Sequence, residues 1–107
     1  MRTETSDNNW KRISSADLES RLKTEIATLP VDLLKTYREH MTAMAEQPCF
    51  HSDPYGPEQV FVVARSGKRL LIFDDVEDEF AIGAADEDGV LREWGLYGAL
   101  IDALRAW

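Results

Sequence analysis

Cysteine is nearly absent from this sequence, which has 107 residues and a single cysteine, Cys49. One cysteine cannot form a disulfide within the chain, and such sparing use is typical of reducing compartments. Long hydrophobic runs are also absent. The first residues, MRTETSDNNW, lack the apolar core of a signal peptide, and no stretch approaches the roughly 20 apolar residues of a membrane-spanning helix. These absences predict a cytoplasmic protein.

Positive charge is in short supply. The chain has 12 Lys and Arg against 20 Asp and Glu, so its formal net charge is −8. Binding to nucleic acid requires Lys and Arg at the phosphates, and binding to anionic membranes requires them at the headgroups. The composition therefore argues against nucleic acid and membrane partners.

Motifs that carry chemistry are missing as well. The sequence contains no glycine-rich phosphate loop, no dinucleotide-binding fingerprint and no hydrolase nucleophile motif. An EF-hand aligned on Gly89 puts Asp86 and Asp88 at ligand positions, but Ala84 and Gly95 fall where carboxylates are essential. We therefore expect no catalytic residue, no metal and no cofactor.

Negative charge, by contrast, is concentrated in one stretch. Residues 74–93 hold nine carboxylates and one base, Arg92, so they carry the whole net charge of the chain. In the remaining positions acids and bases cancel. The acidic stretch coincides with the second half of a predicted sheet.

The hydrophobic patterns predict a single α+β domain over residues 1–107, in which residues 1–9 are disordered. Apolar residues at helical spacing follow an N-cap at Ser14 or Ser15 and predict a helix that Pro30 ends. A second apolar stripe, which includes Met41 and Met44, predicts a helix from Pro30 to Pro48. After a loop over 47–59, we expect a four-stranded antiparallel meander (60–65, 69–75, 79–84 and 90–93) and a C-terminal helix over 96–107.

Two predicted strands are apolar on both faces. One face of the sheet, with Phe61 and Phe73, therefore needs cover, either from the last helix or from a partner. The last helix is itself apolar on nearly all sides, so we expect it to be buried against the sheet or against a second protein. Trp94-Gly95 is expected to end the fourth strand.

The acidic residues lie in two turns that flank the third strand. A meander puts consecutive turns at opposite ends of a strand, so we expect two separate acidic poles. The plain interpretation is that these turns keep the protein dissolved and the sheet edges unpaired. The functional interpretation is a docking surface for a cationic partner, made of Asp74, Asp75, Glu77, Asp78 and Glu79, with a second pole of Asp86, Glu87 and Asp88, and with Trp107 as an aromatic contact.

These features favour a non-catalytic domain that binds a basic protein. A concrete version is a bacterial immunity protein that neutralises a nuclease toxin. The active site of such a toxin is positively charged to hold phosphates, so its inhibitor is expected to be small, cytoplasmic and acidic.

Two alternatives come from other classes. One is a small-ligand-binding or enzymatic domain with its site in the 48–58 loop, using Cys49, His51 and Tyr55. Against it, residues two apart in a loop seldom pair as nucleophile and base, and a buried structural thiol beside a surface histidine is the simpler interpretation. The other alternative is a homo-oligomeric structural domain that pairs through its apolar strands or its final helix.

Overall fold

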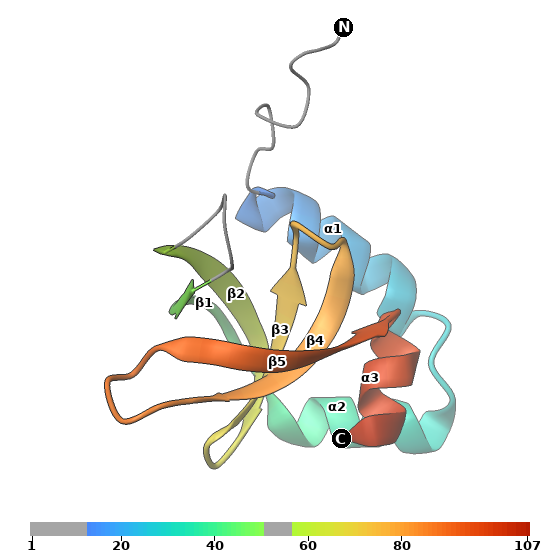
Figure 1. Ribbon diagram of the computed structural model, residues 1–107. Coiled ribbons are helices and arrows are strands. Elements are labelled where there is room, and N and C mark those ends of the chain that lie inside the picture. The colour runs from blue at the N-terminus through green and yellow to red at the C-terminus, as the bar shows by residue number, and fades with distance from the viewer. Residues whose placement is uncertain (1–12, 51–56) are drawn as a thin grey trace, which may run out of the picture.

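The computed structural model describes residues 13–50 and 57–107 (Figure 1). The predicted disorder of residues 1–9 concerns residues outside these ranges. In chain order the elements are α1 (Ser15–Ile26), α2 (Val31–His40), β1 (Met41–Phe50), β2 (Pro57–Ser66), β3 (Arg69–Asp74), β4 (Glu79–Ala85), β5 (Leu91–Gly98) and α3 (Leu100–Ala106).

The predicted fold class is confirmed. Two N-terminal helices precede an antiparallel meander, and a helix closes the chain. The sheet, however, has five strands instead of the expected four, and it closes into a barrel in the order β1-β2-β3-β4-β5. Closure depends on one parallel pair, Cys49 with Leu91, which joins β1 to β5.

The first helix begins where the sequence predicts. The side chain of Ser14 accepts a hydrogen bond from the backbone N–H of Asp17 over 3.1 Å, which satisfies one of the unpaired donors of the first turn. Leu18 and Leu22 are buried on the inner face of α1. The helical spacing therefore identified the packed face correctly.

The extent of the second helix was predicted wrongly. The helix ends at His40, and Met41 adopts an extended conformation with φ −60° and ψ 146°. From there β1 runs to Phe50 and pairs with β2 from Met41↔Ala64 to Phe50↔Pro57. Pairing with a neighbouring strand satisfies the same backbone groups as a helix does, and it overrides weak local helical preference.

The prediction of a loop over 47–59 was therefore also wrong in part. Residues 47–50 lie in β1 and residues 57–59 in β2, while 51–56 are outside the described part of the chain. Pro48 is tolerated because β1 is bonded to only one strand over most of its length, and proline fits an edge position. Beside it, the buried amide of Gln47 donates to the carbonyl of Gly89 over 2.9 Å and ties β1 to the turn before β5.

The last strand is longer than predicted. Trp94-Gly95 does not end it, since β5 continues to Gly98 and pairs along β4 from Ala85↔Leu91 to Phe80↔Gly98. The final helix is correspondingly shorter and begins at Leu100. In Figure 1, β5 is the long orange strand that crosses the front of the barrel and leads into α3.

Two separate hydrophobic cores explain why the central strands are apolar on both faces. One core lies between the helices and the sheet, where Phe73 and Phe80 pack with residues of all three helices, including Leu18, Tyr37 and Leu104. The other core is a second cluster of buried side chains, formed by Cys49, Val60, Val62, Leu70, Ile72, Ala81 and Leu91. The cover that Phe73 requires comes from the chain's own helices.

Candidate protein-interaction surface

Asp74 opens the turn between β3 and β4 and is almost fully buried, with 1% of its surface exposed. Its Oδ1 accepts hydrogen bonds from the backbone N–H groups of Val76 and Glu77 at 3.1 and 3.2 Å. Its Oδ2 accepts a hydrogen bond from the indole Nε1 of Trp94 at 2.8 Å. This carboxylate shapes its own turn and fastens β5 to it.

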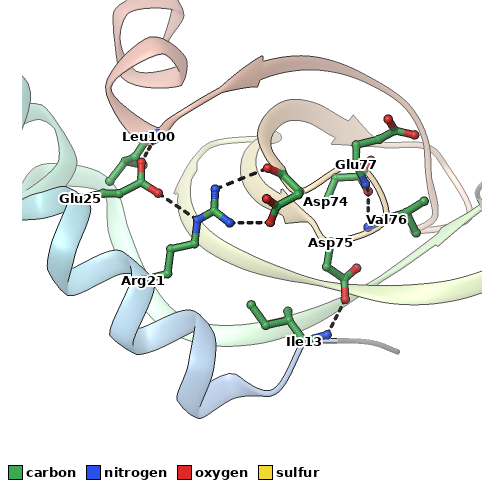
Figure 2. A network of polar contacts seen from close by, with 9 residues as sticks. Ile13, Arg21, Glu25, Asp74, Asp75, Val76, Glu77 and Leu100 are labelled. Carbon is green, nitrogen blue, oxygen red and sulfur yellow. Dashed lines mark hydrogen bonds and ion pairs between the residues drawn. The ribbon is translucent and has the colours of Figure 1, made fainter. Parts of the chain in front are cut away.

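Asp75 and Asp78 in the same turn bind α1 and the segment before it. Figure 2 shows Asp75 directed at the backbone of Ile13, and Arg21 between Glu25 and the acidic turn. Asp75 accepts a hydrogen bond from the backbone N–H of Ile13 at 2.6 Å. Asp78 has a positive φ of 60°. Its Oδ1 accepts a hydrogen bond from Nη1 of Arg21 at 2.5 Å, which is also an ion pair. Only a minority of the carboxylates in the first acidic pole therefore remain directed to solvent alone.

Arg21 extends this network to the last helix. Its Nε donates to Glu25 Oε2 at 3.0 Å, and Glu25 Oε1 accepts the backbone N–H of Leu100 at 2.7 Å. Glu25 thereby serves as the N-terminal cap that Ala99 cannot supply to α3. Partial burial disfavours the charged guanidinium, but hydrogen bonds to Glu25 and Asp78 outweigh that effect and raise the pKa of Arg21.

Asp86 organises the second acidic turn, between β4 and β5. Its carboxylate accepts the backbone N–H groups of Val90 and Asp88 at 3.0 and 2.9 Å, and the Nε of Arg92 at 2.7 Å. The hydrogen bond from Val90, followed by that from Arg92, lowers the pKa of Asp86. The neighbouring Glu87 side chain is exposed.

The two acidic turns lie at opposite ends of β4, as the meander predicts, so they form separate poles. In the described part of the chain, the ion pairs engage Asp78, Asp86 and Glu25. Within residues 74–93, the exposed carboxylates outside those pairs are Glu77 in the first turn, Glu87 and Asp88 in the second, and Glu93 on β5. Glu79, the first residue of β4, is half-buried.

Trp107 packs against the core and contacts the last residue of α2, His40, and the first residue of β3, Arg69. Its ring packs on the helix-side core and stands edge-on to His40, with centroids 5.7 Å apart. Arg69 of β3 places its guanidinium 5.4 Å from the ring and donates a hydrogen bond to the carbonyl of Trp107. These contacts fasten the end of α3 to the barrel.

Cys49 has 2% of its surface exposed and belongs to the second core cluster. The predicted burial of this thiol is confirmed. His51 and Tyr55, its predicted companions in an enzymatic or ligand-binding loop, lie outside the described residues.

A groove that the sequence did not predict lies beside β5. It encloses about 370 Å³ and is lined by Phe50, Asp74, Glu77, Arg92, Glu93, Trp94 and Leu96. Phe50 and Leu96 are each more than two-fifths exposed, an unusual degree for large apolar side chains. The sequence prediction that the strand ends at Trp94 concealed this groove, because Leu96, which lies beyond Trp94 on β5, helps to line it.

Neither a metal site nor a membrane span is evident in the described residues. Within 13–50 and 57–107, no group of three or more His, Cys, Asp or Glu side chains is arranged to hold a metal ion. Over the same residues, no helix is both long and apolar enough to cross a membrane.

Comparison with known proteins does not assign the chain to a family. No protein-family model matches the chain, and neither the curated proteins nor the solved structures include a significant match. Function must therefore be argued from the surface itself.

Proposed function

We propose that this protein is a non-catalytic binding domain of the cytoplasm that docks a positively charged protein. The observation that carries the proposal is the groove beside β5, where the exposed apolar side chains of Phe50 and Leu96 lie next to the carboxylates of Glu77 and Glu93. Apolar contact supplies affinity, while surrounding charge speeds encounter and selects the sign of the partner.

The acidic residues near the groove differ in the contacts that they make, and this difference supports the choice of surface. Asp74, Asp75 and Asp78 are engaged in holding the turn, Trp94 and α1 in place. Glu77 and Glu93 form none of the ion pairs found among the described residues and line an open groove. The groove thus has an inner, structural set of carboxylates in the first acidic pole and an outer pair, Glu77 and Glu93, that is suited to docking.

One concrete form of the proposal is a bacterial immunity protein that blocks a basic nuclease toxin. A small acidic inhibitor fits the phosphate-binding site of a nuclease by charge. A neighbouring gene that encodes a secreted protein with a basic C-terminal domain would supply the candidate partner to test.

The deciding experiment compares two charge-matched double variants in capture of the partner from native cells. Glu77→Gln/Glu93→Gln removes two carboxylates at the groove, and Glu19→Gln/Glu39→Gln removes two exposed carboxylates on the helices. Both variants change the net charge equally, so a general charge effect would reduce capture by both. We expect capture to fall only with the groove variant and to weaken with added salt. Equal capture by the wild-type protein and both variants would refute the proposal.

A further inference from the structure

A cavity opens between the β2–β3 turn and the β4–β5 turn, and it shares no lining residue with the groove beside β5. In Figure 1 the first of these turns is the yellow loop at the bottom, and the second is the orange loop at the left. The cavity encloses about 440 Å³. Small-ligand sites usually have volumes of about 300–1,000 Å³, so this cavity is large enough for one.

The floor of this cavity is the end of the barrel interior. The second hydrophobic core takes buried side chains from all five strands, so it fills the inside of the barrel. Leu70, which lines the cavity, belongs to that core, and the half-buried Ala85 lines the cavity and packs against the same core. The mouth of a β-barrel is one of the places where small-molecule sites occur.

A β-bulge in β2 directs Arg65 to this cavity. The register between β2 and β3 shifts between Val62 and Ala64, so that one residue of β2 is extra. Without the shift Arg65 would lie opposite Arg69, whereas with it Arg65 lies opposite Leu70. Residues paired across neighbouring strands project to the same face of a sheet, so Arg65 shares the inner face with Leu70. Bulges are over-represented next to functional sites, where they re-aim a side chain in this way.

The rim of the cavity has two cations that are available to a ligand. Arg65 and Lys68 are exposed, and neither takes part in an ion pair among the residues that the structure describes. On the other side, Asp86 is already paired with Arg92 over 2.7 Å. Glu87 is exposed there and repels negative charge, so the anionic end of a ligand belongs at Arg65 and Lys68.

We propose that this cavity binds a small organic anion, a carboxylate or a phosphate monoester, that has an apolar body. The Arg65 guanidinium and the Lys68 ammonium hold the anionic group at the rim, and the apolar body lies on Leu70 and Ala85. The planar fork of arginine matches the oxygens of carboxylates and phosphates, and charge-assisted hydrogen bonds are stronger than neutral ones. Burial of the apolar body adds affinity. The inference goes beyond the proposed function, because docking of a basic protein does not require it.

NMR titrations of the ¹⁵N-labelled full chain test the proposal with three probes: hexanoate, hexyl phosphate and 1-hexanol. We expect saturable shifts of the amide signals of Gly67, Leu70 and Ala85 with at least one of the two anions. 1-Hexanol has the same apolar chain without the charge, so it should bind at least about tenfold more weakly than that anion. The anion that binds more tightly identifies the group that the rim prefers.

Two charge-matched double variants separate the site from net charge. Arg65→Gln/Lys68→Gln removes both rim cations, and Lys23→Gln/Lys35→Gln removes two exposed cations on α1 and α2. All four side chains are exposed, so both variants should fold, which circular dichroism verifies. Anion binding should weaken at least about tenfold in the rim variant and stay close to the wild-type value in the helix variant.

Three outcomes would overturn the inference. Equal affinity for 1-hexanol and both anions would show that the rim cations hold no anionic group. Equal weakening by the two double variants would attribute binding to net charge alone. Amide shifts that do not saturate, or that spread evenly over the helices, would show that the cavity is not a binding site.

Discussion

Arg21 on α1 and Asp78 in the β3–β4 turn form an ion pair of 2.5 Å between residues 57 positions apart in the chain. The same guanidinium lies 4.7 Å from the ring centroid of Phe73, which packs edge-on against Phe80. Arg21 therefore holds a helix, an acidic turn and the helix-side core together. Through Glu25 it also reaches the first turn of α3.

Replacing Arg21 by Ala should lower the free energy of unfolding by about 1–2 kcal/mol. The pair with Asp78 is partly exposed and contributes under ~1 kcal/mol after solvent screening, and the cation–π contact adds a similar amount. Urea unfolding followed by circular dichroism measures the change. Lys23→Ala, an exposed cation on the same helix, is the matched control and should change stability by less than about 0.5 kcal/mol. Similar losses in both variants would contradict this role for Arg21.

Asp74→Ala should be the more damaging substitution. It removes the acceptor for two backbone N–H groups and for the indole of Trp94, and unsatisfied buried donors cost about 1–3 kcal/mol each. Asp74→Asn retains one carbonyl oxygen but presents an NH₂ group to the indole, so it should fall between Ala and the wild type. Thermal melts give the ranking, and exposed Glu87→Ala serves as a control. A fully stable Asp74→Ala variant would show that the network is dispensable.

Asp86 should make stability depend on pH. Hydrogen bonds from Val90 and Arg92 lower its pKa below the ordinary value of 3.8, so its carboxylate binds protons less readily in the folded state than in the unfolded one. Its stabilising contribution is therefore present above the unfolded pKa and is lost as pH falls through the folded pKa. The stability difference between wild type and Asp86→Asn should be constant near neutrality and shrink below about pH 4. A difference that stays constant down to low pH would contradict this assignment.

Gly83→Ala should destabilise the contact between β4 and β5. A Cβ at Gly83 would lie 2.8 Å from Cδ1 of Leu91 and 2.9 Å from the backbone oxygen of Glu93. Backbone cannot swing aside as a side-chain tip can, so we expect a loss of about 1–3 kcal/mol in urea unfolding. Gly95→Ala on the facing strand is the control, because its nearest contact would be an ordinary 3.4 Å from the ring of Tyr97. Equal stability of the two variants would show that the strands separate easily.

Local sequence was sufficient for the parts of this protein that depend on near neighbours. The Ser14 cap, the apolar face of α1 and the order of the three helices and of strands β2 to β5 follow from hydrophobic period and capping chemistry. The position of the acidic turns at opposite ends of β4 follows from strand alternation. Because β2 and β3 are apolar on both faces, the sequence correctly predicted that both faces are covered. Only the tertiary structure shows that the chain's own helices cover one of them.

The tertiary structure alone decided two matters. Met41–Phe50 forms a strand because β2 provides its hydrogen-bonded partner. The side chains of this segment are mostly exposed, so its sequence shows no alternation of apolar and polar residues that would predict a strand. Asp74 and Glu77 look alike as neighbouring acids, yet one is buried against Trp94 and the other lines an open groove. Strand pairing, ion pairs and burial join residues that are distant along the chain, so no local pattern can encode which partner each group finds.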